Sequence, residues 1–382
     1  MRVLIAGEWA WPWYEEACAN ALVKLGHEVM RFSWLEKFRC FRVGDVEPQY
    51  FSKYREIQNR LILGPIVSAL NKELLKTVEE FRPHILLGYR ATHIFPATLR
   101  KIKRRHADIT LVQYCNDDPF SRRANPILWR HLKRAIPFYD IHFVYRHHNI
   151  DDFKGCGAKR AELLRSYYIP ERNYPVTLGR EDKRFVCDVV FAGHYEADFR
   201  VEYIETIIRA GYKLNLFGGG WYKALSRLPP DSPLRPLFPI APVVDTDYRK
   251  ALSGAKIALC FLSKLNRDTY TRRNFEIPAT GAFMLSEYSD DLATLYKEGL
   301  EAEFFRTKEE MMDKIKYYLT HDVQRREIAR RGRERVLLDG HDVTARMKQM
   351  MDIISPLKGW QDSWRLPNEV SDVRLGNYKI QG

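Results

Sequence analysis

The first thirty residues constrain the fold most strongly, because they alternate a buried strand, an amphipathic helix and a second strand. Residues 2–6 form a short apolar run that ends at Gly7, which is typical of a strand buried on both faces. Apolar residues then recur at helical spacing up to Gly26, and residues 27–32 form the next strand-like run. Such a strand–helix–strand unit favours parallel pairing of its two strands. The chain therefore begins as an α/β domain.

The same alternation continues and then starts a second time. After a polar link near residues 170–184, a new cycle of buried strands begins. The predicted strands after the opening unit lie at residues 84–89, 110–115, 141–145, 186–192, 213–217, 257–262 and 283–286. At 382 residues the chain is long enough for two cores. We therefore predict an α/β fold of two tandem Rossmann-like domains that face a central cleft.

The predicted boundaries follow from that division. Residues 1–175 form an N-terminal Rossmann-like domain, and residues 184–340 form a C-terminal Rossmann-like domain. Residues 341–382 form a C-terminal helix, which could pack back on the N-terminal domain, and a polar tail. Ligands of open α/β sheets bind beyond the carboxyl ends of the strands, so a ligand is expected between the two domains.

The net charge indicates possible partners, and the cysteine pattern indicates the cellular compartment. The net charge is +13, and residues 1–180 carry 30 Lys and Arg against 19 Asp and Glu, a net charge of +11. An anionic membrane surface, an anionic substrate or nucleic acid could each explain this excess, and so could a surplus that serves solubility. The six cysteines include no Cys-x-x-Cys pair, so they indicate reduced thiols in the cytoplasm. No signal peptide or membrane span is apparent, and peripheral contact with the inner face of a membrane stays open.

Residues 268–286 contain the most informative group of candidate ligand-binding residues. Asp268 and Glu276 bracket Arg272 and Arg273, and Gly281 follows just before an apolar run. Arginines can bind a diphosphate with bidentate geometry, helix-start amides add partial positive charge, and carboxylates suit sugar hydroxyls. The segment therefore predicts a site for an anionic, hydroxyl-rich ligand.

Glycine turns in the second half support this interpretation. Gly193 follows one predicted strand, Gly218 and Gly219 follow another, and Gly281 lies in a third turn. Glycine lets a ligand approach the backbone closely, although strand-to-helix turns often contain glycine for structural reasons alone. The Gly-x-Gly-x-x-Gly fingerprint of dinucleotide-binding domains is missing from the first half, where residues 7–13 are instead rich in tryptophan. That aromatic loop either faces an acceptor or packs in the core.

These motifs resemble those of a known group. The runs Phe-Ala-Gly-His-Tyr-Glu-Ala-Asp-Phe-Arg at 191–200 and Leu-Phe-Gly-Gly-Gly-Trp at 216–221 are similar to segments of bacterial GT-B glycosyltransferases related to the spore-maturation protein CgeB. The run from Arg273 to Leu285 resembles the Arg-x-Phe-Glu-x-x-Ala-x-Gly core of that family. The first half matches more loosely, at Tyr14 to Val29 and at Asn116 to Pro119.

The resemblance implies a transferase that uses a nucleotide-diphosphate sugar. In related retaining enzymes a Glu-x7-Glu pair contacts the donor; here Glu276 falls on the ribose position and Asp268 on the sugar position, where aspartate departs from the pattern. Arg273 would face the diphosphate, with Arg200 as a second candidate. The full predicted donor site is Gly193, His194, Arg200, Gly218, Gly219, Trp221, Arg272, Arg273, Asn274, Glu276 and Gly281.

Catalysis is expected from Arg273, Asp268 and one of two aspartates. Asp117 and Asp118 follow a strand of the first domain, where either could orient or deprotonate an acceptor hydroxyl; an Asx turn before Pro119 is the structural alternative. GT-B enzymes do not need a bound metal for this chemistry, so the resemblance implies no bound metal and no cofactor other than the donor substrate.

The predicted function is a cytoplasmic GT-B glycosyltransferase, metal-independent and retaining, which acts on a glycan, a lipid-linked sugar or a surface-polysaccharide precursor. Two rivals stay open, namely a nucleotide-sugar epimerase on the same fold and a catalytically degenerate binding protein in surface assembly. Nucleic-acid binding through the basic half lacks a recognition motif.

Overall fold

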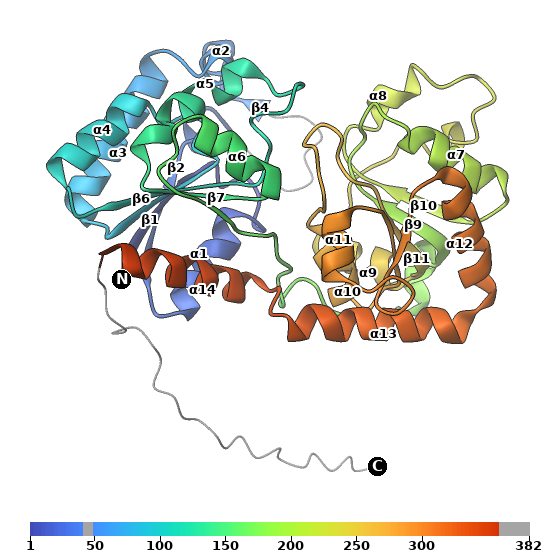
Figure 1. Ribbon diagram of the computed structural model, residues 1–382. Helices are drawn as coiled ribbons and strands as arrows, with labels where there is room; N and C mark the ends of the chain where they lie inside the picture. Colours follow the sequence, from blue (N-terminus) through green and yellow to red (C-terminus); the bar gives the residue numbers. More distant parts are fainter. Residues whose placement is uncertain (41–48, 359–382) are drawn as a thin grey trace, which may run out of the picture.

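The computed structural model describes residues 1–40 and 49–358, which form two α/β domains side by side (Figure 1). Each domain is built on its own parallel sheet, with strand order β2-β1-β5-β6-β7-β8 in the first and β10-β9-β11-β12-β13 in the second. A two-stranded antiparallel ribbon is separate from both sheets. The predicted pair of Rossmann-like domains is thereby confirmed.

The N-terminal sheet is buried on both faces. Along β1, Leu4 and Ala6 point into one core, while Val3 and Ile5 point into the other. This period-two alternation explains why the strand consists of apolar residues without interruption. The strands of this domain are β1 (Arg2–Gly7), β2 (Glu28–Ser33), β3 (Arg39–Cys40), β4 (Gln49–Tyr50), β5 (Ile85–Tyr89), β6 (Thr110–Cys115), β7 (Ile141–Val144) and β8 (Ala161–Leu163).

Helices cover each face of that sheet. One core packs the sheet against α3, α4 and α5, and the other packs it against α1 and α14. Gly64 and Pro65 separate α2 from α3, because proline is favoured at a first helical position and removes a donor from any longer helix. The helices are α1 (Glu15–Lys24), α2 (Lys53–Leu61), α3 (Pro65–Phe81), α4 (Pro96–Arg105), α5 (Pro126–Ala135) and α6 (His147–Gly155).

The C-terminal domain repeats the plan with shorter strands. Its strands are β9 (Cys187–Ala192), β10 (Leu214–Phe217), β11 (Ala255–Cys260), β12 (Met284–Glu287) and β13 (Glu303–Phe305). Its helices are α7 (Arg200–Arg209), α8 (Tyr222–Leu225), α9 (Asp245–Ser253), α10 (Arg273–Ala279), α11 (Asp290–Leu295), α12 (Lys308–Thr320) and α13 (Asp322–Leu338). Short 3₁₀ turns lie at Leu35–Lys37, Ile136–Phe138, Arg180–Phe185, Arg235–Leu237 and Ser355–Lys358.

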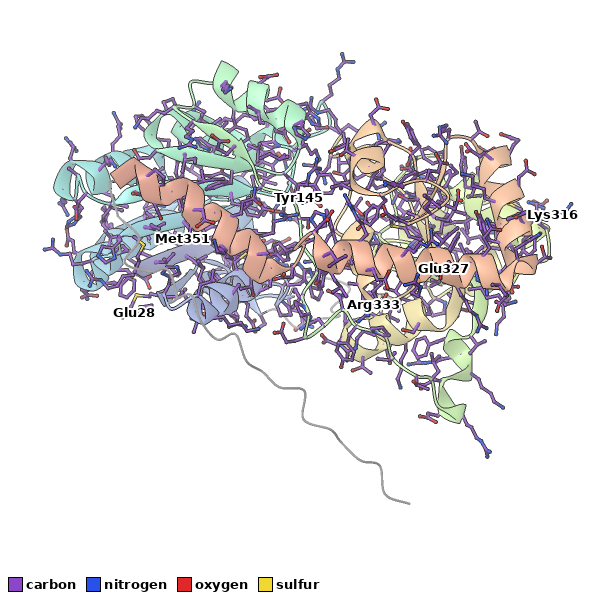
Figure 2. All side chains as sticks on the ribbon, turned by 60° about the horizontal axis from the view of Figure 1, so that its bottom comes forward. Glu28, Tyr145, Lys316, Glu327, Arg333 and Met351 are labelled. Atoms are coloured by element: carbon purple, nitrogen blue, oxygen red, sulfur yellow. The ribbon has the colours of Figure 1, made fainter. Side chains whose placement is uncertain are left out.

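After α13 the chain crosses back to the first domain. Gly340, with φ of +62°, follows the end of α13 and turns the chain. The Asp342 side chain then accepts hydrogen bonds from the Thr344 and Ala345 amides, which starts α14 (Val343–Ile354). Figure 2, in which the lower side of Figure 1 comes forward, shows α13, which carries Glu327 and Arg333, and α14, which carries Met351, one after the other across the front of both domains. The N-terminal core therefore includes residues from the end of the described chain. The predicted polar tail at 359–382 lies outside the described residues.

Besides the short ribbon strands β3 and β4, the sequence did not reveal β8 and β13, which lie at the edges of the two parallel sheets. Each has three residues, and each contains a glutamate that interrupts the apolar run, Glu162 in β8 and Glu303 in β13. Glu303 is nevertheless buried, because Lys314 lies 2.7 Å from its carboxylate and the Tyr318 hydroxyl donates to it. Partners from a helix that follows in the chain make this strand possible, and a local apolar pattern cannot indicate them.

The packing of α14 against the N-terminal domain can be tested at Met347, a fully buried residue of that helix. Met347→Ala leaves a cavity and should lower the free energy of unfolding by about 2–5 kcal/mol. The exposed neighbour Lys348, whose charged pair with Asp352 lies in solvent, serves as the control through Lys348→Ala. Thermal unfolding should show a clearly lower melting temperature for the first variant only; equal melting temperatures would contradict the packing described here.

Candidate functional site

Two glycine turns of the C-terminal domain pair with each other at the carboxyl ends of β9 and β10. The Gly193 amide donates to the Phe217 carbonyl at 2.8 Å, and the Tyr195 amide donates to the Gly219 carbonyl at 3.0 Å. A Cβ on Gly218, which has φ of +152°, would lie 1.9 Å from the Gly193 carbonyl oxygen. Only glycine fits there, so these turns form a close-packed backbone platform at the cleft.

Arg273 lies over this platform. Its Nε donates to the Ala192 carbonyl at 2.8 Å, and a Cβ on Gly193 would come within 2.9 Å of its Nη2. A side chain at Gly193 would clash with the Phe191 ring, whose nearest carbon would lie 2.5 Å from the added Cβ, and also with this guanidinium. Among the described residues, no acceptor binds the terminal nitrogens of Arg273. A cation with unused donors is what a diphosphate requires.

His194 lies on the same platform and is exposed. Its ring approaches Gly219, where a Cβ would lie 3.1 Å from the imidazole. Partial enclosure in the cleft lowers the pKa of His194, and the nearby guanidinium groups of Arg273 and Arg200 add to that effect. The neutral imidazole can accept or donate a hydrogen bond next to Arg273.

Two residues of the predicted sugar-donor site are buried and support the backbone of this platform. Trp221 is fully buried, and its indole N–H donates to the Gly193 carbonyl at 2.9 Å. Arg200 is 3% exposed; it binds both oxygens of Asp198 at 2.8 Å and donates to the His194 carbonyl at 2.7 Å. The guanidinium of Arg200 is thus used within the loop, and the structure does not aim it at a ligand. Both side chains hold the turns in place.

Gly281 lies apart from the other predicted glycines. It follows α10 and precedes β12, so it is at the amino-terminal edge of the sheet, opposite the cleft. With φ of +72°, it closes the helix, since its amide donates to the Pro278 carbonyl at 2.8 Å. The expectation that Gly281 contacts the donor is therefore corrected: parallel strands place the turn before a strand and the turn after it at opposite ends.

The amides at the start of α10 are also engaged. The Asn274 side chain accepts from the Thr271 amide at 2.8 Å, and the Thr271 hydroxyl accepts from the Arg273 amide at 3.2 Å. Asn274 is fully buried and donates to Ser286 at 2.9 Å. The sequence predicts that the first-turn amides and Asn274 bind an anion. In the structure these groups instead cap α10, a helix of seven residues. The positive charge of this site comes from the arginine side chains.

Glu276 lies one turn into α10 and is 7% exposed. The Tyr248 hydroxyl donates to its Oε2 at 2.8 Å, and Arg272 Nε lies 2.9 Å from its Oε1. Burial and the Glu276 carboxylate raise the pKa of Tyr248 well above its usual value, so this phenol keeps its proton. The carboxylate is thereby held in one orientation beside Arg273.

Arg272 reaches the other domain. Its Nη1 donates to the Trp13 carbonyl at 2.8 Å, and its guanidinium lies 4.9 Å from the centre of the Tyr14 ring. Since Arg272 also binds Glu276, one side chain links the predicted ribose carboxylate to the aromatic loop of the N-terminal domain. The guanidinium is oriented by three groups, and a diphosphate would have to share it with them.

Asp268 is the predicted sugar-side carboxylate, and it is held by the N-terminal domain. Arg146, which is 1% exposed, donates from Nε to Asp268 Oδ1 at 2.7 Å and from Nη1 to the Asn116 carbonyl at 3.2 Å. Burial raises the pKa of Asp268, and the adjacent Arg146 guanidinium partly offsets that effect. The ion pair joins the domains across the cleft.

The two predicted acceptor-side aspartates differ in their surroundings. The Asp118 side chain is fully buried; Arg267 of the other domain donates to it at 2.5 and 3.0 Å, and Asn149 donates at 3.0 Å. Burial acts to raise the pKa of Asp118, but the nearby His148 imidazole, 3.5 Å away, and the hydrogen bonds from Arg267 hold it well below its usual range. Enclosed in this way, Asp118 does not reach an acceptor and instead anchors the domain contact.

Asp117, in contrast, lines a cavity of about 180 Å³ at the carboxyl edge of the N-terminal sheet. Arg90 Nε lies 2.9 Å from Asp117, and Arg90 Nη1 donates to Glu8 at 3.2 Å. The cavity is lined by Glu8, Ala10, Trp11, Tyr14, Glu15, Tyr89, Arg90, Asn116 and Asp117.

The lining of this cavity is largely aromatic and acidic. Trp11 lines it and stacks on Trp13 with the ring centres 4.8 Å apart. Burial raises the pKa of Glu15, whose Oε1 accepts hydrogen bonds from the Glu8 and Trp9 amides. The tryptophan-rich loop therefore both faces the cavity and packs. Carboxylates beside a flat aromatic ring can bind the hydroxyls and the apolar face of a sugar.

Sequence reasoning missed several residues of the cleft. Glu8, Arg90 and Arg146 were not singled out, although each follows directly or within one residue of a buried strand, as Asp117 does. Because the carboxyl ends of parallel strands share one edge, a charged residue just after such a strand is a usable signal. Tyr248 had no signal, since it reaches Glu276 only through packing of α9.

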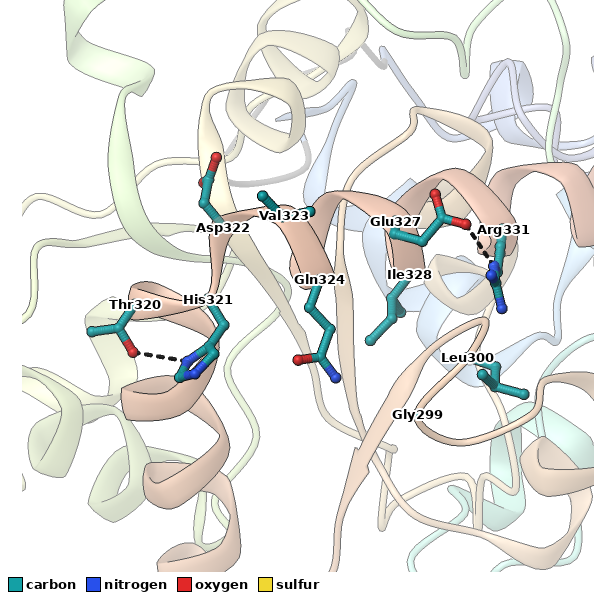
Figure 3. Close-up of a pocket in the computed structure, with 10 residues that line it drawn as sticks. All are labelled: Gly299, Leu300, Thr320, His321, Asp322, Val323, Gln324, Glu327, Ile328 and Arg331. Carbon is teal, nitrogen blue, oxygen red and sulfur yellow. Dashed lines mark hydrogen bonds and ion pairs between the residues drawn. The ribbon is translucent and has the colours of Figure 1, made fainter.

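A larger hollow lies away from the cleft. It measures about 680 Å³ and lies between the start of α13, with Asp322 and Val323, and the turn at Gly299 and Leu300 (Figure 3). Glu327 and Arg331, which form an ion pair at 2.7 Å, border it on α13. It contains none of the predicted site residues.

Within residues 1–40 and 49–358, no group of three or more His, Cys, Asp or Glu side chains is arranged to hold a metal ion. Over the same ranges, no helix has both the length and the apolar character needed to cross a membrane.

Part of the chain matches a described protein family. Residues 200–352 match the model of a family described as glycosyl transferase-like. That segment contains Arg273 and Glu276 and lies mostly in the C-terminal domain. No curated protein matches the chain by sequence.

Solved structures match over nearly the whole chain. Sucrose-phosphate synthase from Thermosynechococcus elongatus has a TM-score of 0.68 at 12% identity, covering 94% of this chain and 99% of that one. HepE from Anabaena, in complex with UDP-glucose, has a TM-score of 0.64 at 10% identity, covering 93% and 100%. A putative UDP-N-acetylglucosamine 2-epimerase from Listeria monocytogenes has a TM-score of 0.55 at 10% identity, covering 94% and 97%. The fold is GT-B, as the sequence predicted.

The Arg146–Asp268 pair gives a testable prediction about how the cleft is held. Arg146→Ala leaves a buried carboxylate without its partner and should lower the free energy of unfolding by about 3–5 kcal/mol. Arg146→Ala combined with Asp268→Ala should recover part of that loss, since no lone charge is left buried. Thermal and denaturant unfolding measure both. Arg326→Ala, at an exposed ion pair of α13, is the control, and additive losses in the double variant would contradict a direct coupling.

Proposed function

We propose that this protein is a glycosyltransferase that moves a sugar from a nucleotide-diphosphate donor to an acceptor bound on the N-terminal domain. The observation that carries the proposal is that Arg273 and Glu276 both lie on α10 at the cleft, within a segment that matches a glycosyl transferase-like family. In this proposal the Glu276 carboxylate accepts the ribose hydroxyls, in competition with Tyr248 and Arg272, and the terminal nitrogens of Arg273 donate to the diphosphate. We also propose that the chain belongs to the CgeB-like group, because its motifs at 191–200, 216–221 and 273–285 resemble that group's.

The chemistry follows from the leaving group. As the bond between the anomeric carbon and the phosphate oxygen breaks, negative charge grows on the diphosphate, and Arg273 stabilises it more in the transition state than in the ground state. A bond then forms between the anomeric carbon and the acceptor oxygen. In a retaining reaction on the same face of the sugar, the leaving phosphate takes the acceptor proton. No metal is needed for this scheme, which we propose as metal-independent.

The acceptor is proposed to enter the cavity lined by Asp117. Its carboxylates, with Trp11 beside them, favour a hydroxyl-rich end group, such as that of a glycan, a lipid-linked sugar or a surface-polysaccharide precursor. Asp117 would orient the attacking hydroxyl. We place the reaction in the cytoplasm. The complex of HepE with UDP-glucose supports a uridine donor as the first to be tried.

Nucleotide binding tests the donor site. Glu276→Gln should weaken binding of the matching nucleoside diphosphate by about tenfold to a hundredfold, because a carboxylate accepts two ribose hydroxyls better than an amide does. A thermal-shift screen of nucleoside diphosphates first identifies the base, and calorimetry then measures the affinity. Glu309→Ala, on the exposed surface of α12, is the matched control. Undiminished affinity in Glu276→Gln would refute the site.

A second candidate is a binding protein that does not transfer sugar. The observation in its favour is that the sugar-side carboxylate, Asp268, is already held by Arg146. The fold is also shared with a putative epimerase, which would turn over donor without acceptor.

Product analysis separates these functions. A transferase should release nucleoside diphosphate slowly alone and much faster with an acceptor glycan, and Asp117→Asn should lower the acceptor-dependent rate while nucleotide affinity stays unchanged. Epimerised donor formed without acceptor would favour the epimerase. Tight nucleotide binding without turnover across an acceptor panel would favour the binding protein.

A further inference from the structure

An apolar stripe lies exposed on the outer face of α2. Tyr54, Ile57 and Leu61 follow at spacings of three and four residues, so they share one side of the helix, while Gln58 and Ile62 face the core. Tyr54 is 58% exposed and Ile57 is 55% exposed. Exposed apolar residues that flank or adjoin the stripe extend it into a patch formed by Phe51, Tyr54, Ile57, Leu61, Leu63 and Ile127.

The patch continues onto α5. Arg130 of α5 donates to the Ile62 carbonyl at 2.8 Å, which brings the helix against the end of α2. Ile127, Arg130 and Arg134 are spaced by three and four residues, so one face of α5 adds an apolar side chain and two cations to the edge of the patch. Figure 1 shows α2 and α5 together on the upper side of the N-terminal domain, away from α14.

Cations border the apolar stripe and acids are scarce. Lys53 and Arg60 lie on the adjoining side of α2, with 89% and 70% of their side chains exposed. Glu56 pairs with both of them, but only 13% of its side chain is exposed, so cations dominate the outer surface. α2 and α5 each contribute three Lys or Arg, and Glu56 is their one acid. The N-terminal half as a whole carries a net charge of +11.

We infer that this patch docks the protein onto an anionic phospholipid surface, in addition to its proposed activity. An amphipathic helix with exposed aromatic and aliphatic side chains inserts into the boundary between headgroups and acyl chains, while bordering Lys and Arg side chains bind anionic headgroups. A protein partner would be expected to match the cations with specific acids; a lipid surface needs only the combination of an apolar stripe and diffuse positive charge that α2 and α5 present. Docking would hold the cleft near a membrane-bound acceptor.

Sedimentation with lipid vesicles tests the inference on the full chain. The protein should bind vesicles of phosphatidylcholine mixed with phosphatidylserine more tightly than vesicles of phosphatidylcholine alone, and added NaCl should weaken the binding. Tyr54→Ser with Ile57→Ser should weaken it by at least about tenfold, since two exposed apolar side chains no longer insert. Lys53→Ala with Arg60→Ala should abolish most of the preference for phosphatidylserine.

A matched control comes from the other domain. Val323 and Leu338 of α13 are each 85% exposed and apolar, so Val323→Ser with Leu338→Ser removes comparable surface outside the patch and should leave vesicle binding unchanged. Light scattering and nucleotide binding on every variant establish that each is folded and competent for donor binding.

Three outcomes would overturn the inference. Absence of binding to the anionic vesicles would do so, and so would equal losses in the α13 control pair. A dimer that dissociates on Tyr54→Ser with Ile57→Ser would show that a second copy covers the patch instead. Because nucleotide binding is measured separately, failure of vesicle binding leaves the proposed transferase function intact, and loss of nucleotide binding leaves the docking surface intact.

Discussion

The buried pair of Arg146 and Asp268 is the contact on which the arrangement of the cleft depends. A guanidinium and a carboxylate this deeply enclosed must stay paired, because either one alone would carry a large desolvation cost. The pair lies between the domains, so any rotation that separated them would expose that cost. Together with Arg267 on Asp118, it ties the loop after β11 to the N-terminal domain. The same residues therefore hold the domains together and set the geometry of the proposed donor site.

That coupling has a consequence for how a donor could enter. Asp268 and Arg272 are both engaged by the N-terminal domain, Asp268 through Arg146 and Arg272 through the Trp13 carbonyl. Arg273, in contrast, is oriented only within its own domain. A nucleotide diphosphate could therefore be recognised by the C-terminal domain first, and the sugar end would then compete with contacts between the domains. Binding energy from the nucleotide is available to drive such a rearrangement.

The two sides of the cleft also differ in charge. The C-terminal side presents Arg273 over a glycine platform, which suits an anionic leaving group. The N-terminal side presents Glu8 and Asp117 around Arg90, beside Trp11, which suits neutral hydroxyl-rich groups. The positive excess of the N-terminal half therefore lies outside the cleft, in part on α2 and α5. The basic character of the N-terminal half therefore gives no indication of the charge of the ligand that enters its side of the cleft.

The sequence by itself determined the parallel strands, the two-domain α/β fold and the glycine turns, because burial on both faces and backbone space are local demands. It could not separate Asp117 from Asp118, or assign Arg200 and Trp221 to support of the platform, because neighbours distant in the chain decide those roles. Gly281 was misplaced for a topological reason, since a turn before a parallel strand lies at the opposite edge from the turn after it. Only the tertiary structure decided that Arg146 holds Asp268, because that contact joins residues 122 positions apart in the chain.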